Sequence, residues 1–191
     1  MSKLIRTGVV GVGTMGQHHA RIWAAMPGSQ LIGVADPNIE RAREIAARHD
    51  VPAYADYRDL LAQVDAVSLA APTTLHHQIA LDCLAQGVHL LVEKPLAATL
   101  SEAQSLVQAA QQAGAVLQVG HVERFNPTFA ELANVLSGRQ IVAIDAHRLS
   151  PFATRASDVS VVYDLMIHDL DLVLTLIRSP LAGIKAVGSK A

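Results

Sequence analysis

The sequence predicts an α/β fold in which helices cover both faces of a parallel β-sheet, followed by an incomplete α+β region. Short apolar runs alternate with helical segments along most of the chain. The runs are continuously apolar, which is typical of parallel strands buried on both faces. This alternation stops near residue 120. We therefore expect one domain over 1–120 and a second, smaller one over 121–191.

The expected elements of the first domain follow from apolar runs and from residues that end helices. The strands are expected at 4–10, 31–35, 53–54, 67–71, 88–92 and 116–119. The helices are expected at 14–26, 38–48, 74–86 and 99–112. Thr99 and Glu102 have the spacing of a capping box, and Gly114 ends that helix. The order predicts a doubly wound sheet.

The second domain is expected to contain few elements. Asn126 and Pro127 are typical of the N-cap and first position of a helix, which we expect to reach about residue 136. A strand is expected at 141–147, a helix at about 160–178 and the start of another strand at 184–188. So few strands do not form a stable sheet by themselves.

Composition excludes several classes of protein. Half of the 191 residues are hydrophobic, and the net charge is -2 without a basic tract, which argues against a nucleic-acid partner. Cys83 is the only cysteine, so a disulfide framework or a four-thiolate zinc site is excluded. No apolar run is long enough for a membrane span, and we expect no signal peptide before the first strand. We expect a soluble, cytoplasmic protein.

A glycine-rich turn, Gly11-Val12-Gly13-Thr14-Met15-Gly16, joins the first strand to the first helix. Gly11 permits a tight turn, Gly13 lets the backbone approach a pyrophosphate, and Gly16 permits close packing of helix on strand. The helix N-terminus, with Thr14 and Met15, offers N–H groups and partial positive charge to phosphates. The turn predicts a dinucleotide site, although a tight turn without a ligand is the alternative.

Asp36 ends the second strand, twenty residues after Gly16. A carboxylate there can accept hydrogen bonds from both ribose hydroxyls and would repel a 2′-phosphate. This favours NAD over NADP as the cofactor. Arg41 is close enough in sequence to reach a 2′-phosphate instead.

Lys94 lies in the run Glu93-Lys94-Pro95, directly after a buried strand. Open α/β sheets bind ligands at the carboxyl ends of their strands, where a lysine can stabilise negative charge on a substrate oxygen. The alternative is a solvated surface lysine.

Asp164 and His168 are four residues apart and share a helix face, with Asp171 three residues further on. A histidine in apolar surroundings can act as a general base near neutral pH, and a carboxylate can orient it. One alternative is a salt bridge within a packed helix. The other is a zinc site, which is less favoured because hydride chemistry requires no metal.

Together these residues resemble the glucose–fructose oxidoreductase and inositol dehydrogenase family (Gfo/Idh/MocA). Ala71-Pro72-Thr73-Thr74-Leu75-His76 is similar to the family's Thr-Pro-Asn-x-x-His segment, departing from it at Ala71 and Thr73. Glu93-Lys94-Pro95 matches the family tripeptide, and Val119–Pro127 resembles its crossover into the second domain. Asp164-x-x-x-His168-x-x-Asp171 matches its catalytic helix.

The resemblance implies a Rossmann domain and hydride transfer between nicotinamide and a hydroxyl carbon of a sugar, cyclitol or sugar nucleotide. It implies that His168 takes the hydroxyl proton, Lys94 polarises the oxygen and Asp164 binds or orients. It also implies cofactor contacts beyond the glycine turn, namely Ala71, Pro72, His76, Glu93 and Lys94. The segments around Arg124 and His168 are most similar to members that oxidise sugar nucleotides of the UDP-N-acetylglucosamine type.

Family members are longer, and their second domain is an open sheet that forms oligomer interfaces. The chain therefore resembles a truncated product or a fragment, and we expect homo-oligomers formed through the C-terminal sheet. The alternative to an enzyme is a nucleotide-binding module without turnover, or a regulatory partner, because the substrate domain is short.

Overall fold

The computed structural model describes residues 4–149, 160–177 and 179–188. The chain divides into two compact units, Met1–Gly120 and His121–Ala191. Each unit has its own architecture and is described separately.

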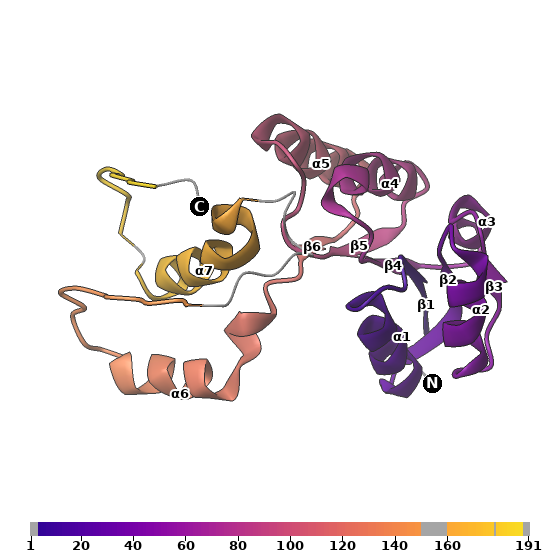
Figure 1. The fold of residues 1–191 in the computed structure, drawn as a ribbon, viewed down its shortest axis with the longest axis horizontal. Helices are drawn as coiled ribbons and strands as arrows, with labels where there is room; N and C mark the ends of the chain where they lie inside the picture. Colours follow the sequence, from indigo (N-terminus) through magenta and orange to yellow (C-terminus); the bar gives the residue numbers. More distant parts are fainter. Residues whose placement is uncertain (1–3, 150–159, 178, 189–191) are drawn as a thin grey trace. The chain divides into compact units, whose positions relative to one another are not determined.

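The first unit contains a six-stranded sheet with the order β3-β2-β1-β4-β5-β6, in which every neighbouring pair is parallel (Figure 1). The strands are β1 (Ile5–Val10), β2 (Ser29–Ala35), β3 (Ala53–Tyr54), β4 (Ala66–Leu69), β5 (His89–Val92) and β6 (Leu117–Val119). The order reverses between β1 and β4, which is the position where doubly wound sheets bind ligands. The predicted doubly wound parallel sheet is confirmed.

Five helices connect these strands: α1 (Gly16–Ala25), α2 (Ile39–Ala47), α3 (Arg58–Leu61), α4 (Thr73–Ala85) and α5 (Leu100–Ala113). Thr99 and Glu102 form the predicted capping box at the start of α5. Gly114 ends the helix in the left-handed conformation, with φ 63°. The single turn α3 is not predicted from sequence, because four residues are too few to show helical periodicity.

The core of the first unit lies on both faces of the sheet. Val9 and Val34 pack with Ala20 of α1 and Ile45 of α2 in one cluster. The other cluster contains strand residues together with α3, α4 and α5, including Leu60, Leu69, Leu84 and Leu106. Because successive strand residues point to opposite faces, β1 contributes Val9 to the first cluster and Val10 to the second.

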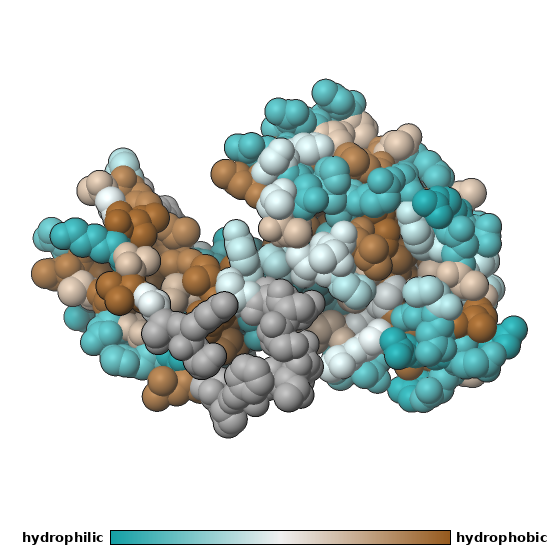
Figure 2. All heavy atoms as spheres, turned by 45° about the horizontal axis from the view of Figure 1, so that its top comes forward, coloured by the Kyte–Doolittle hydropathy of each residue, from teal (hydrophilic) through white to brown (hydrophobic). Residues whose placement is uncertain are grey.

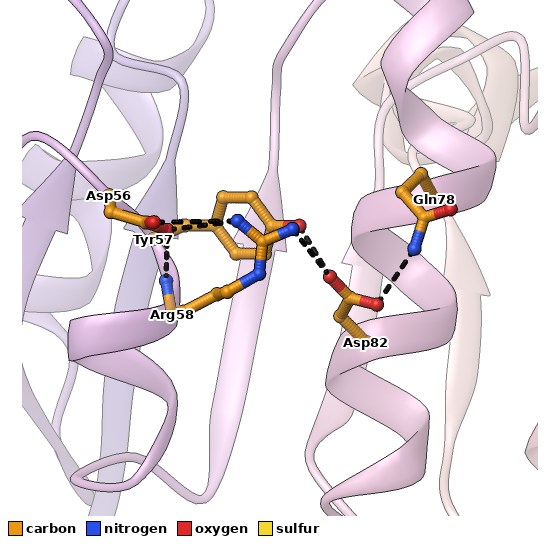
Figure 3. A network of polar contacts seen from close by, with 5 residues as sticks. All are labelled: Asp56, Tyr57, Arg58, Gln78 and Asp82. Carbon is orange, nitrogen blue, oxygen red and sulfur yellow. Dashed lines mark hydrogen bonds and ion pairs between the residues drawn. The ribbon is translucent and has the colours of Figure 1, made fainter.

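A polar network joins α3 to α4 (Figure 3). The Tyr57 hydroxyl donates to Asp82 at 2.6 Å, and Gln78 donates to the same carboxylate at 2.8 Å. The Arg58 guanidinium lies 3.3 Å from Asp82 and 4.7 Å from the centre of the Tyr57 ring. Partial burial and the hydrogen bond to Asp82 raise the pKa of Tyr57 to about 12. The network therefore stabilises the neutral phenol of Tyr57 and connects the two helices.

The second unit contains the 3₁₀ turn η1 (Val122–Phe125), α6 (Pro127–Leu136), the π-helical turn η3 (Val162–Met166) and α7 (Ile167–Leu176). Asn126 caps α6 by accepting from the Thr128 N–H, and Pro127 takes the first helical position, as predicted. The helix predicted at 160–178 is present as η3 followed by α7. Its last predicted residue, Arg178, lies outside the described residues.

The strands predicted at 141–147 and 184–188 are wrong, because both segments are described without strand structure. Apolar and β-branched residues favour a strand only where a neighbouring strand completes the hydrogen-bond ladder. The described parts of the second unit therefore contain no sheet through which the predicted oligomer could form. Within the described ranges, none of the helices has the length and apolar character needed to cross a bilayer.

Candidate functional site

The predicted cofactor residues of the first unit lie at the carboxyl ends of the strands. Because the strands are parallel, the loops that follow β1, β2, β4 and β5 all leave from their carboxyl ends. These loops contain the glycine turn, Asp36, Ala71-Pro72 and Glu93-Lys94-Pro95. The fold thus brings together segments that are widely separated in sequence, at the position where sheets of this kind bind dinucleotides.

The glycine turn depends on two close backbone approaches. Gly11 has φ +82°, and a Cβ on it would lie 2.7 Å from the Ala71 backbone nitrogen. A Cβ on Gly16 would lie 1.8 Å from the Gly11 carbonyl oxygen. At Gly13, by contrast, a Cβ would have no atom within 4 Å. Gly11 and Gly16 are therefore required by the packing of the loop, whereas Gly13 borders open space.

The N-terminus of α1 is suited to an anion. No side-chain hydrogen bond caps the helix at Met15, and its first turn contains no acidic residue. Uncapped N–H groups and the helix dipole attract phosphate oxygens. Thr14 and Met15 are exposed beside this turn, so the residues present fit a pyrophosphate group.

Asp36 is buried and links the end of β2 to the glycine turn. Its Oδ2 accepts from the Val12 N–H at 3.0 Å, and its Oδ1 accepts from the Asn38 N–H at 2.9 Å. Each carboxylate oxygen has a second lone pair, so Asp36 can accept further hydrogen bonds. The Arg41 guanidinium lies 3.8 Å from Oδ2 with a half-exposed side chain.

His76 is buried on α4 and joins two of the loops. Its Nδ1 lies 3.0 Å from the Pro95 carbonyl oxygen, and its Nε2 lies 2.8 Å from the Ala71 carbonyl oxygen. Pro72 is the exposed residue that precedes α4. His76 therefore lies against the loop backbones after β4 and β5, and its predicted contact with a cofactor stays a prediction.

Lys94 is half-buried directly after β5, and its peptide bond to Pro95 is cis. The neighbouring Glu93 is buried, with one carboxylate oxygen 2.8 Å from the His19 Nε2 of α1. The other carboxylate oxygen accepts from the Lys94 backbone N–H at 3.3 Å.

Sequence reasoning missed His19. The available signal was its position three residues after Gly16, on the helix face that packs closely on the sheet.

The second unit contains the other predicted catalytic residues. Asp164 belongs to η3 and His168 to α7, and both side chains are half-buried. Lys94 belongs to the first unit, so the predicted catalytic set is divided between the two units. Across the described residues, no group of three or more histidine, cysteine or acidic side chains is arranged to hold a metal ion.

Two arginines hold α7 within the second unit. The Arg124 guanidinium donates to both carboxylate oxygens of Asp171, through Nε at 2.7 Å and through Nη2. The Arg148 Nε donates to Asp169 at 2.8 Å and 3.0 Å. The hydrogen bond from Asp171 raises the pKa of Arg124. Asp171, which shares the face of His168, is thus an anchor of the helix, and the sequence does not predict this pairing.

Comparison with known proteins assigns the family. Residues 5–121 match the model of an oxidoreductase family with an NAD-binding Rossmann fold, GFO_IDH_MocA. The chain belongs to this family. It is 43% identical over 187 residues to UDP-N-acetylglucosamine 3-dehydrogenase from Acidithiobacillus ferrooxidans. The matched region covers 98% of this chain and 59% of that protein.

Other relatives and solved structures support the same family assignment. The chain is 32% identical to inositol 2-dehydrogenase 4 from Saccharopolyspora erythraea, over 94% of this chain and 56% of that protein. A crystal form of the Acidithiobacillus ferrooxidans enzyme superposes with a TM-score of 0.87 at 41% identity, covering 100% of this chain and 62% of that one. GenD2 from gentamicin A biosynthesis, in complex with NAD, gives a TM-score of 0.81 at 26% identity, covering 92% and 54%. The chain thus spans less than two thirds of the length of these relatives.

Proposed function

We propose that this chain belongs to an NAD-dependent dehydrogenase that oxidises a hydroxyl group of a sugar nucleotide of the UDP-N-acetylglucosamine type. The observation that supports this most strongly is the 43% identity to UDP-N-acetylglucosamine 3-dehydrogenase along 98% of the chain. The compared region includes the segment of Lys94 in the first unit and the helix of Asp164 and His168 in the second. More distant relatives that act on inositol make a cyclitol the second substrate class to examine.

NAD is the proposed cofactor, with NADP less favoured. The glycine turn and the uncapped N-terminus of α1 would hold the pyrophosphate. The buried Asp36 carboxylate would accept from the ribose hydroxyls and repel a 2′-phosphate. Arg41 pairs weakly with Asp36 at 3.8 Å and is the residue that would most directly support NADP instead.

The proposed roles of the catalytic residues follow from their chemistry. The bound dinucleotide would supply a hydride acceptor, so oxidation of the alcohol requires only that the hydroxyl proton be removed. His168 is the proposed general base for that proton, and Asp164 is proposed to orient substrate or imidazole. Lys94 would donate a hydrogen bond to the substrate oxygen and stabilise its developing negative charge. The products are then a ketone, a reduced dinucleotide and one proton.

The test is NADH formation, followed by absorbance, with UDP-N-acetylglucosamine and myo-inositol as substrates. We expect His168→Ala and Lys94→Ala each to lower kcat by about 10²–10⁴-fold, because one removes the proton acceptor and the other the hydrogen-bond donor to the substrate oxygen. The matched control is Lys185→Ala, which removes a lysine outside the proposed site and should leave turnover unchanged. Equal activity of the Lys94 and Lys185 variants would contradict the proposed role of Lys94.

A nucleotide-binding module without turnover is the second candidate. The second unit buries only one of its described residues, the charged Asp171, so it lacks the apolar core expected of a complete substrate domain. NAD binding without NADH formation across a broad panel of sugars would favour this candidate. Binding and turnover together would exclude it.

A further inference from the structure

His19 and Glu93 form a buried pair at the carboxyl end of β5. The His19 Nε2 lies 2.8 Å from the Glu93 Oε1, and the two side chains are 12% and 10% exposed. His19 comes from α1 and Glu93 from the loop that also contains Lys94. A contact so well shielded from water connects the helix of the dinucleotide site directly to the residue before Lys94.

Glu93 is enclosed on its other sides as well. Its Oε2 accepts from the Lys94 backbone N–H at 3.3 Å. A Cβ on Gly120 would lie 3.1 Å from Oε1, so a larger residue at this position would require the carboxylate to shift. Gly120 is itself fixed by its N–H, which donates to the Val92 carbonyl oxygen at 2.7 Å. The carboxylate is therefore held between α1, the Lys94 backbone and the end of β6.

We propose that His19 is a positioning residue for Lys94. By holding the Glu93 carboxylate, His19 fixes the backbone from which the Lys94 side chain leaves the sheet. Without this donor, a buried carboxylate loses a close partner and the turn gains freedom, because unpaired buried charge is unfavourable. The His19 side chain contacts Glu93, so in this proposal it acts only through Glu93 and Lys94. The proposal rests on the catalytic role of Lys94 proposed above.

The test compares the reactivity of two lysines in the full chain, which requires no turnover. The protein is treated briefly with an amine-acylating reagent, and the modification of Lys94 and Lys185 is measured by peptide mass spectrometry. His19→Leu removes the donor and retains side-chain volume. His19→Gln retains a donor, since its carboxamide nitrogen can reach a position similar to Nε2. Trp23 fluorescence checks that each variant is folded.

We expect His19→Leu to raise the rate of Lys94 acylation about fivefold or more relative to Lys185, and His19→Gln to return it to within about twofold of the unsubstituted chain. In turnover, His19→Leu should lower kcat about tenfold with the KM for NAD within about threefold. Because Lys185 lies in the second unit, a role confined to the stability of the first unit is recognised by an altered unfolding transition of Trp23, and it would not be rescued by glutamine.

Three results would overturn the proposal: an unchanged Lys94 rate in His19→Leu, equal changes at both lysines, or no rescue by His19→Gln. Failure of the proposed function is distinguishable from these. If the chain shows no turnover, the acylation rates of Lys94 and Lys185 can still be compared. If the chain is active and its His19→Leu variant keeps both its kcat and its Lys94 acylation rate, the proposed function stands and this inference is wrong.

Discussion

The two units of the chain are held together in contrasting ways. In the first unit, apolar side chains fill both faces of the sheet, and Val9, Leu60 and Leu69 are fully buried. In the second unit, the only buried residue among those described is Asp171, which pairs with Arg124. Large apolar side chains of that unit stay exposed, including Val142, Leu174 and Ile184, and brown residues are prominent on its part of the surface in Figure 2. Hydrophobic burial therefore stabilises the first unit, whereas ion pairs hold α7 of the second.

The largest expected effect comes from the core of the first unit. Leu69→Ala should lower the free energy of unfolding by about 2–5 kcal/mol, because it leaves a cavity between β4 and the helices. Leu174→Ala is the matched change in the second unit, where the side chain is already 63% exposed. It should change stability by less than about 0.5 kcal/mol. Urea unfolding followed by circular dichroism measures the stability of both variants. Similar losses of stability would contradict the proposed contrast between the two units.

The second expected effect concerns the ion pair of the second unit. Asp171→Asn leaves the Arg124 guanidinium without its charged partner and should destabilise α7 locally by about 1–3 kcal/mol. Hydrogen–deuterium exchange should then rise in α7. Unfolding of the first unit, followed by Trp23, should be unchanged, because the Trp23 indole N–H donates to Ser68 within that unit.

Glu131→Gln provides the control for Asp171→Asn, since it removes an exposed charge from α6 of the same unit. It should leave the exchange of α7 unchanged. If both variants raise exchange equally, then net charge, rather than the Arg124–Asp171 pair, stabilises the helix.

The smallest effect is a dependence on alkaline pH that belongs to the first unit. Burial raises the pKa of the Cys83 thiol from 9.0 to about 12. The folded state keeps this proton after the unfolded chain has lost it, so stability is complete below pH 9 and falls as pH rises toward 12. The loss should be about 1 kcal/mol between pH 9 and pH 10. Unfolding at both pH values should show a smaller slope for Cys83→Ala, and an unchanged slope would exclude the thiol as its source.

Local features of the sequence predicted the first unit well. The glycine turn, the position of Asp36 after β2 and the Thr99–Glu102 capping box each depend on a few neighbouring residues. The strand at 141–147 was predicted wrongly because its apolar pattern cannot show whether a partner strand is present. The sequence also does not reveal the pairs His19–Glu93 and Arg124–Asp171. Their members lie 74 and 47 residues apart and meet only through the packing of α1 on the sheet and of η1 with α7.

The most direct test of the account is hydrogen–deuterium exchange of the full chain with and without NAD. Binding at the carboxyl edge of the sheet should slow exchange in the glycine turn, at Asp36 and in the loop of Glu93 and Lys94, while α6 stays unchanged. Asp36→Ala should weaken that protection, because it removes the proposed acceptor for the ribose hydroxyls. No protection at these positions, or protection confined to the second unit, would contradict the assignment of the dinucleotide site.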